Sequence, residues 1–462
     1  IWYQMILTCS SDFRYRLFVS IFSIVPTLIL YYWQFPFANP LLLWSQIIFS
    51  IILVAFGLPI FILLASLAIF FFLSEPTEWA TNYDLISTIS DSAYRIVVSP
   101  TLAAIPIFTL AGYILAESNI SDRLIKFFKS SLGWLPGSTV LIVVILCAFF
   151  TALTGGSGVT ILALGAILYP ILVHDGYSKR FSLGIITTAG SLGLLFPPSL
   201  PAIIYSVTAG INPLELFRQA LIPAIFLMSI MFFYGLYMLP KNKKIEKFNF
   251  NNAYYSSIIA KWDIDIPILI ILSLFSVFAT LVESAALLVL YVLTVELYIF
   301  KDVSFKDLPK IIIDCSTLVG GVLIILGFAM GFTGYLVDAQ IPLKILNFVQ
   351  NTISSKIIFL LALNILLLII GCLMDVFSAI IVVVPLIAPL AAYFGIDPFH
   401  LAIIFIANLE LGYITPPVGM NLYLSSYRFN KDMPTIYSAT LPFFFIRLIG
   451  VLFITYIPLF FY

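Results

Sequence analysis

The chain has 462 residues, of which 62% are hydrophobic and only 10% are charged, and its mean hydropathy is +1.13. Soluble domains carry roughly 25% charged residues, so this composition excludes a water-exposed globular protein. The 22 basic and 22 acidic residues balance one another, which argues against a nucleic-acid partner. Because long apolar runs dominate from end to end, the sequence predicts an all-α polytopic membrane protein.

Apolar runs of bilayer length, about 20 residues, follow one another along the chain. They cover residues 16–34, 41–73, 96–116, 134–173, 182–210, 219–239, 266–300, 311–336, 356–394, 399–424 and 436–461. No A-x-A-like cleavage site follows the first run, so residues 1–40 are interpreted as an extra, retained N-terminal transmembrane helix or connector. The initial Ile leaves open that the chain begins inside a longer protein.

Two of these runs, 134–173 and 356–394, are too long for a single crossing. At 1.5 Å per residue, forty helical residues reach roughly 60 Å, about twice the hydrocarbon thickness. Each run has polar residues in its middle, "TALTGGSGVT" at 151–160 and "GCLMDVFSA" at 371–379. Each therefore predicts a spanning helix followed by a re-entrant hairpin, with hairpin 1 at about 151–173 and hairpin 2 at about 372–394.

The two halves of the chain are related by an internal duplication. When the sequence slides on itself by 219 positions, Gly193 falls on Gly412 and Pro197-Pro198 falls on Pro416-Pro417. The hairpin tips and the flanking apolar runs also coincide. This predicts a first repeat at 41–239 and a second at 266–462.

The hydrophilic segment 240–265 separates the two repeats, and its lysines predict a cytoplasmic basic loop. Counting crossings from that loop makes the two hairpins enter from opposite sides, so the repeats are expected to be inverted. The segment "SNISDRLIKFFKSS" then lands outside despite Arg123, and it is interpreted as an amphipathic helix along the interface.

Each repeat also contains an interrupted helix, at 182–210 and at 399–424. Glycine and Pro-Pro open the backbone there, and freed peptide groups persist at membrane depth only inside protein or beside a wet cavity. Released carbonyls can replace the hydration shell of Na⁺, and helix N-termini attract an anion. A single interruption is most simply explained as a helix kink or a site of close helix packing. The presence of the same interruption in both repeats favours a binding centre.

Few charged residues lie inside the apolar runs. Asp375, at the second hairpin tip, could hold a cation or cap the following helix, and Glu410 could be a proton or cation site or a structural partner. Glu296 and Arg447 are expected to be interfacial or paired within the bundle. No arginine is expected near either interrupted segment, so a carboxylate substrate would be held by dipoles, hydroxyls and bound cations.

Four stretches resemble the large membrane subunit of tripartite ATP-independent periplasmic (TRAP) transporters, a resemblance that runs from about residue 41 to the C-terminus. They are "TALTGGSGVTILALGAILYP", "GSLGLLFPPSLPAIIYS", "GCLMDVFSAIIVVVPLIAPL" and "LGYITPPVGMNLYLSS". The resemblance implies an elevator-type transporter in the bacterial inner membrane that takes up a small organic acid, such as a C4-dicarboxylate or sialic acid, with Na⁺. It also implies two partners, a small four-helix membrane subunit and a periplasmic substrate-binding protein.

The resemblance further implies which residues bind the ligands. Na⁺ would lie between each hairpin tip and the neighbouring interrupted segment, held by Gly156, Ser157, Gly193 and Pro197 in one half and by Asp375, Gly412, Thr415 and Pro417 in the other. The substrate would lie between the tips, and the candidate ligands are Ser157, Ser199, Asn408 and Asn421. Many members have a Ser-Ser pair where this chain reads Gly156-Ser157-Gly158.

Three other classes of function are open to a polytopic membrane protein. A stand-alone Na⁺-coupled dicarboxylate symporter or ion antiporter of related inverted-hairpin design is the main alternative. A membrane-embedded enzyme would need converging His, Asp or Cys groups, and His174 and His400 stand in separate connections, so neither an enzyme activity nor a cofactor other than the coupling ion is expected. A channel would need a continuous polar stripe, which no predicted helix has.

Overall fold

The computed structural model describes residues 98–240, 248–276, 279–353 and 355–460, together with a few positions before Val98. The chain forms two compact units, 1–86 and 87–462. In the first unit the structure describes only Ile62 and the helical stretch 64–68. The predicted helix or connector in 1–40 therefore lies outside the described residues, and helices α6 to α22 belong to the second unit.

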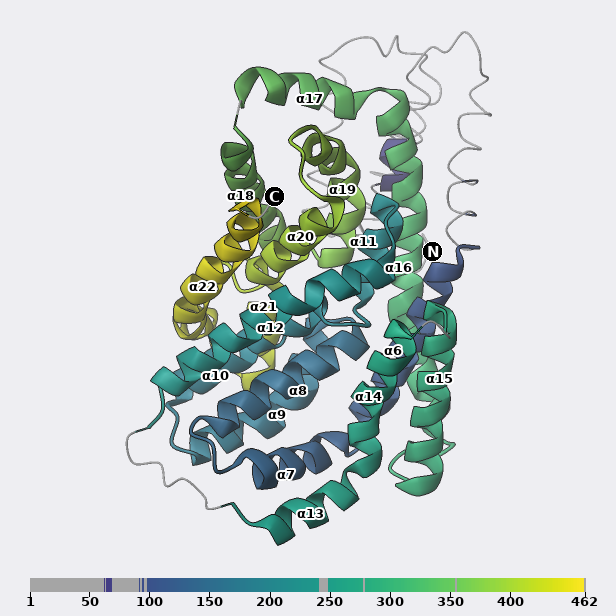
Figure 1. Ribbon diagram of the computed structural model, residues 1–462. Helices are drawn as coiled ribbons and strands as arrows, with labels where there is room; N and C mark the ends of the chain where they lie inside the picture. The colour runs from purple at the N-terminus through teal and green to yellow at the C-terminus, as the bar shows by residue number, and fades with distance from the viewer. Residues whose placement is uncertain are drawn as a thin grey trace, which may run out of the picture. The chain divides into compact units, whose positions relative to one another are not determined.

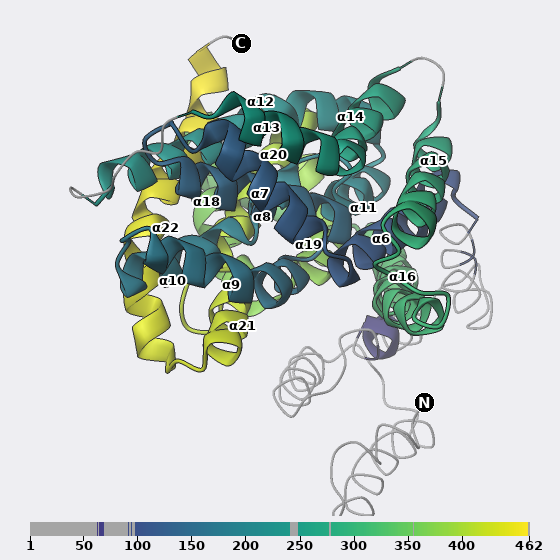
Figure 2. The same cartoon turned by 90° about the horizontal axis from the view of Figure 1, so that it is seen from below.

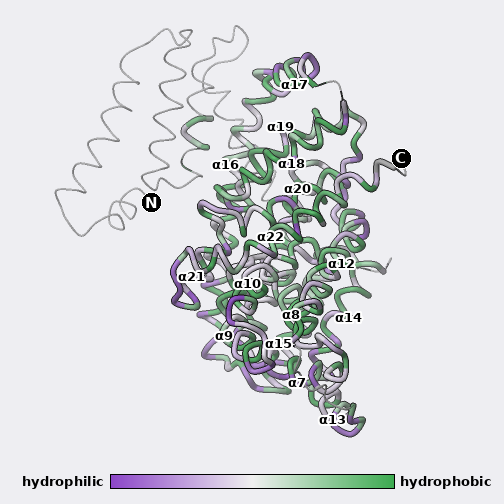
Figure 3. The backbone as a smooth tube through the Cα atoms, turned by 90° about the vertical axis from the view of Figure 1, so that its left-hand side faces the viewer, coloured by the Kyte–Doolittle hydropathy of each residue, from purple (hydrophilic) through white to green (hydrophobic). Residues whose placement is uncertain are grey.

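Every regular element of the described residues is helical. Among them, seven helices are long and apolar enough to cross a membrane, or nine if each sharply bent pair is one span. Hydrophobic residues colour most of the length of these helices, while hydrophilic residues gather at α13, α17 and the end of α21 (Figure 3). The structure thus confirms the predicted all-α polytopic fold.

One set of helices, here called the core helices, contains two hairpins, two broken helices and two long closing helices (Figure 1). In the first repeat they are α8 (Ser138–Thr154), α9 (Ser157–His174), α10 (Lys179–Ala189), the 3₁₀ turn η1 (Leu192–Leu195), α11 (Leu200–Ala209) and α12 (Pro213–Tyr237). In the second repeat they are α18 (Lys356–Leu373), α19 (Val376–Tyr393), α20 (Pro398–Gly412), α21 (Met420–Phe429), α22 (Met433–Tyr456) and the terminal 3₁₀ turn η3 (Ile457–Phe460).

The same shift of 219 positions that aligns the sequence aligns these helices. Helices α9 and α19 begin 219 positions apart, at Ser157 and Val376. They also end 219 positions apart, at His174 and Tyr393. Helices of one repeat pack on helices of the other. The second half of each broken helix packs on the hairpin of the other repeat, α21 on α9 and α11 on α19. The first half of each packs on the closing helix of the other repeat, α10 on α22 and α20 on α12. The α9–α21 pair is visible in Figure 2.

The two hairpins enter the core from opposite ends. Hairpin α8/α9 follows α7 (Ile120–Leu132) at one end of the unit, and hairpin α18/α19 follows α17 (Ile341–Thr352) at the other (Figure 1). Helices α7 and α17 also correspond under the shift. These pairings describe two inverted repeats.

Each hairpin fills its whole apolar run, where the sequence predicted a spanning helix and a shorter hairpin. Helix α8 has 17 residues and α9 has 18, so each arm reaches only about 26 Å and leaves no chain for a further crossing. Gly155, in the left-handed conformation at φ 69°, ends α8 and allows the reversal. The tips lie at Gly155-Gly156 and at Met374-Asp375.

The remaining helices, here called the outer helices, pack beside the core. They are α6 (Pro100–Glu117), α7, α13 (Phe250–Ile259), α14 (Lys261–Phe275), α15 (Leu281–Thr294) with the π turn η2 (Val295–Ile299), α16 (Leu308–Asp338) and α17. Helix α7 is bent by 75° from α6, as an interface helix would be. The expected loop 240–265 contains α13, whose first turn is capped by Asn249 through the N–H groups of Asn251 and Asn252.

A cluster of four charged side chains ties the outer helices together. The Arg123 guanidinium of α7 donates to both carboxylate oxygens of Asp263 at 2.6 and 3.1 Å, and to Glu296 Oε1 at 3.0 Å. It also donates to Asp302. The Asp263 and Glu296 side chains are completely buried. Arg123 therefore neutralises carboxylates that have left water, and Glu296 is paired within the bundle as the sequence allowed.

We expect Arg123→Gln to lower the stability of the purified protein markedly. Removing one member of a buried ion pair typically costs about 3–5 kcal/mol, because the remaining charge stays buried without compensation. Arg218→Gln is the control, since Arg218 pairs with Glu215 on the surface at 3.1 Å with 65% of its side chain exposed, and such pairs contribute at most about 1 kcal/mol. Thermal unfolding in detergent measures both variants, and equal melting temperatures would contradict the prediction.

Candidate cation and substrate site

The first broken helix contacts the last two turns of α8, just before the tip of the first hairpin. Between α10 and α11, whose axes differ by 43°, the chain passes through η1 and Pro197-Pro198. Thr151 Oγ1 of α8 donates to the carbonyl oxygen of Gly190 at 2.7 Å. A Cβ built on Gly193 would lie 2.2 Å from the carbonyl oxygen of Ala148. Only a glycine lets the broken backbone approach the hairpin so closely.

The second broken helix repeats this arrangement. A Cβ on Gly412 would lie 2.6 Å from Cα of Gly371, in the last turn of α18. The N–H of Val376 at the second tip donates to the Tyr413 hydroxyl at 2.6 Å, and the N–H of Gly419 donates to the Cys372 carbonyl at 3.2 Å. In both repeats, therefore, a hairpin tip is held directly against a break.

Both breaks contain a cis Pro-Pro bond, but the two breaks differ in exposure. Residues 190–195 and 198–199 of the first break are buried and Phe196 and Pro197 half-buried, whereas residues 416–418 of the second are exposed. The second break is thus the more exposed of the two.

Asp375 acts as a helix cap. One carboxylate oxygen accepts from the backbone N–H of Ser378 at 3.0 Å, and the other accepts from the Ser378 hydroxyl at 2.6 Å. These contacts satisfy the first turn of α19. The sequence alone allows both capping and cation binding for Asp375, and the observed contacts are those of a cap.

Two of the predicted ligand residues carry buried oxygens that have no hydrogen-bond partner, Ser157 Oγ and Asn421 Oδ1. Asn421 also links the repeats, because its Nδ2 donates to the carbonyl oxygen of Thr187 at 3.1 Å. The Thr187 hydroxyl, which donates to the Leu183 carbonyl, in turn accepts from the Ser425 hydroxyl at 2.8 Å. A buried polar group without a partner costs about 1–3 kcal/mol, so these two oxygens are the best-placed groups in the site to receive a ligand.

Other predicted residues are engaged within the protein. The Ser199 hydroxyl donates to the Leu194 carbonyl and accepts from the N–H of Ala202 at 3.4 Å. Thr415 Oγ1 donates to the Leu411 carbonyl at 2.8 Å.

Two more predicted residues lie in contacts of their own. Pro417 accepts from the Tyr437 hydroxyl at 2.8 Å through its carbonyl oxygen. Asn408 lies one turn before the second break, where its Nδ2 donates to Asn364 Oδ1 at 2.7 Å and to the Ile404 carbonyl at 2.8 Å. The structure joins its amide to α18 and does not bring it to a hairpin tip.

An arginine does lie at a broken segment, so the expectation that none is nearby was wrong. Arg447 of α22 donates through Nη1 to Ser191 Oγ at 3.1 Å and to the Thr188 carbonyl at 3.4 Å, and through Nη2 to Glu410. Both charged side chains are fully buried. Arg447 is more than 250 positions from Ser191 in the sequence, and only the packing of α10 on α22 brings them together. The position of Arg447 inside an apolar run indicates a buried, paired arginine, because charged side chains within membrane helices normally face the bundle interior.

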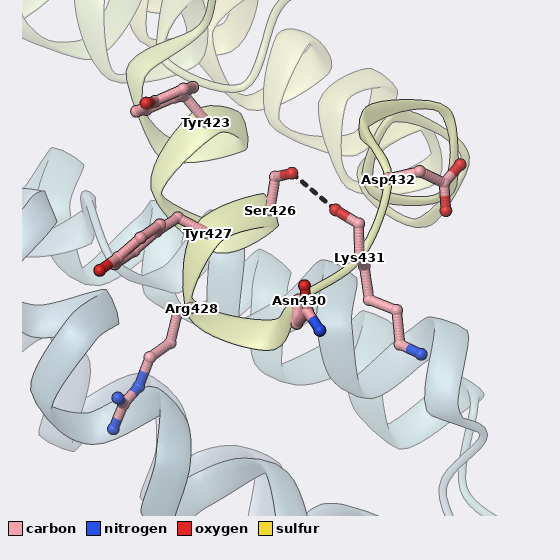
Figure 4. Close-up of a pocket in the computed structure, with 7 residues that line it drawn as sticks. All are labelled: Tyr423, Ser426, Tyr427, Arg428, Asn430, Lys431 and Asp432. Carbon is pink, nitrogen blue, oxygen red and sulfur yellow. Dashed lines mark hydrogen bonds between the residues drawn. The ribbon is translucent and has the colours of Figure 1, made fainter.

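An open groove of about 730 Å³ lies elsewhere, around the end of α21 and the start of α22. Its side chains point in different directions: Tyr427 and Arg428 toward neighbouring helices, Asp432 away from them (Figure 4). The Ser426 hydroxyl donates to the Lys431 carbonyl at 2.6 Å across it. Because these groups do not converge, the groove is not the candidate site.

Comparison with known proteins identifies the family. The family model described as "Tripartite ATP-independent periplasmic transporter, DctM component" matches residues 47–460. The chain is 32% identical over 361 residues to the C4-dicarboxylate TRAP transporter large permease protein DctM of Pseudomonas aeruginosa, covering 78% of this chain and 84% of that one. It is 29% identical over 376 residues to the isethionate TRAP transporter permease protein DctMQ of Oleidesulfovibrio alaskensis, covering 81% and 59%.

A solved structure shares the fold. The YdaH transporter of Alcanivorax borkumensis superposes with a TM-score of 0.61 at 14% identity, over 87% of this chain and 97% of that one. Together with the extent of the family match, which confirms the resemblance seen in the sequence, these findings show that the chain belongs to the DctM family, the large membrane component of tripartite ATP-independent periplasmic transporters.

Proposed function

We propose that this chain is a Na⁺-coupled permease subunit that moves a small organic acid across the bacterial inner membrane. The observation that carries the proposal is the duplicated contact between a hairpin tip and a broken helix. At each contact a glycine of the broken helix packs against backbone atoms of a hairpin helix, and Ser157 Oγ at the first tip and Asn421 Oδ1 just after the second break are buried without a hydrogen-bond partner. Such discontinuous helices serve as ion and substrate sites in secondary transporters.

The cations would bind where each tip meets its break. Gly156, Ser157, Gly193 and Pro197 would supply the first site, and Asp375, Gly412, Thr415 and Pro417 the second. Peptide carbonyls and hydroxyls are the oxygen ligands that hard cations prefer. A bound cation at each tip would also attract a carboxylate between them.

The substrate is proposed to be a small organic anion. The two relatives compared above are named for a C4-dicarboxylate and for isethionate, which share a negative charge and small size. Ser157 and Asn421 are the best-placed ligands: the free Ser157 hydroxyl can donate to the anion, whereas the free Asn421 Oδ1 can only accept, from an O–H group of the substrate. Ser199 and Asn408 would contribute after rearrangement, since their side chains are bonded within the protein.

Transport is proposed to follow an elevator mechanism, in which the core helices move as a body against the outer helices. The exchanged packing of the repeats supports this, since each hairpin is joined to the broken helix of the other half. The proposed partners are a small four-helix membrane subunit and a periplasmic substrate-binding protein. A stand-alone symporter of the same fold is the alternative.

We expect uptake into proteoliposomes to require both an inward Na⁺ gradient and all three components. Replacing Na⁺ by K⁺ should reduce C4-dicarboxylate uptake to background, because the larger ion does not fit a site formed by fixed carbonyls. Omitting either partner should do the same. Undiminished uptake in K⁺ would refute Na⁺ coupling, while uptake by this subunit alone would favour the stand-alone symporter.

A further inference from the structure

Arg447 and Glu410 form the one fully buried ion pair among the core helices that the structure describes. The pair joins three elements, since Glu410 belongs to α20, Arg447 to α22 and the atoms that Arg447 contacts to the first break. Charged side chains inside a membrane are costly and usually have a function. A pair of apolar residues would fill the same space without that cost.

The contacts continue from the pair to both hairpins. In one direction, Arg447 holds the Thr188 carbonyl and Ser191 hydroxyl, while Thr151 of the first hairpin holds the intervening Gly190 carbonyl. The Thr151 hydroxyl also accepts from the Thr160 hydroxyl at 2.7 Å, which joins the two arms of that hairpin.

In the other direction, Glu410 lies two residues before Gly412. That glycine rests against the last turn of α18, next to the second tip. Helix α20 also packs on η1. A series of hydrogen bonds, short stretches of chain and backbone contacts therefore runs from the first hairpin to the second, and the ion pair lies in its middle.

We propose that the Arg447–Glu410 pair is a positioning device that couples the two cation sites. Binding of a cation at one tip would fix its break, and the pair would hold the other break in the binding geometry. This inference rests on the proposed function, because it requires a cation at each tip. Two sites coupled in this way bind cooperatively, each raising the affinity of the other by the same factor.

The test is the Na⁺ dependence of uptake in the reconstituted three-component transporter. The wild type is expected to give a Hill coefficient approaching two, the number of sites. Glu410→Gln and Arg447→Gln should each lower it to about one and raise the half-saturating Na⁺ concentration by at least about 5-fold. Arg447→Lys, which keeps the charge and a donor, should recover part of the cooperativity.

Two further variants separate coupling from stability. The double variant Glu410→Leu/Arg447→Met fills the space with apolar side chains, which often preserves or improves stability. It should remain folded yet lose cooperativity. Arg123→Gln breaks the buried cluster of the outer helices and should lower the melting temperature while leaving the Hill coefficient unchanged.

A double variant with wild-type Na⁺ affinity and Hill coefficient would overturn the proposal and leave the pair a purely structural element. A Hill coefficient of one in the wild type would also overturn it, although the proposed function would stand. Absence of any Na⁺ activation in the wild type would instead refute the proposed function itself.

Discussion

Replacing Gly193 or Gly412 by alanine is expected to abolish Na⁺-driven uptake while the protein still inserts into the membrane. A Cβ on Gly193 would lie 2.2 Å from the Ala148 carbonyl oxygen and 2.6 Å from the Ala152 nitrogen. A Cβ on Gly412 would lie 2.5 Å from the Gly371 carbonyl carbon. These neighbours are backbone atoms of the hairpin helices, so the tip and the break must separate to admit one methyl group.

The expected size of this effect follows from the geometry. Overpacking of this kind costs about 1–3 kcal/mol, which an inserted membrane protein can tolerate. A displacement of about 1 Å at a binding centre, however, can reduce activity by roughly 100-fold. Uptake should therefore fall much more than the amount of protein in the membrane.

Gly320→Ala is the matched control for this experiment. Gly320 lies inside α16, and a Cβ there would meet nothing within 4 Å. Initial rates of uptake, divided by the amount of inserted protein, compare the three variants. Normal rates for the Gly193 and Gly412 variants would mean that tip and break need not touch for transport.

The sequence predicted most of the core helices because their apolar runs and interruptions are local features. Proline and glycine interrupt a helix wherever they occur, and the duplication doubled the signal at Gly193 and Gly412. The number of helices within each long apolar run could not be predicted in the same way. The run 134–173 divides into two arms at Gly155, and run length alone could not distinguish one hairpin from a helix followed by a shorter hairpin.

The contacts between distant segments were beyond the sequence. Arg447 and Ser191 meet only because α22 packs on α10, and one sequence contains no information on that pairing. The same is true of Arg123, whose three carboxylate partners lie 140 to 179 positions away. The sequence allowed Glu296 and Arg447 to be either interfacial or paired within the bundle and placed Arg123 on an interfacial helix, but it named no partner for any of them.

Replacing Asn421 by leucine is expected to reduce substrate uptake by roughly 100-fold, the loss that a misplaced binding group can cause. Asn421 is fully buried and joins the repeats by donating to the Thr187 carbonyl, while its own Oδ1 has no partner. Leucine keeps the volume and removes both polar groups. Ser425→Ala is the control, because it deletes the neighbouring contact with the Thr187 hydroxyl and leaves Asn421 intact.

Asn421→Asp then decides which ligand the free oxygen meets. If Oδ1 accepts from an O–H group of the substrate, as proposed, the added negative charge repels the anion, so substrate binding is lost while Na⁺ binding persists. If Oδ1 faces a cation, the carboxylate strengthens Na⁺ binding instead, since an opposite charge at contact distance favours both ions. Equilibrium binding of Na⁺ and of a C4-dicarboxylate, measured separately on the purified variant, distinguishes the two. Unchanged binding of both ligands would place Asn421 outside the site and leave its bond to Thr187 as its whole role.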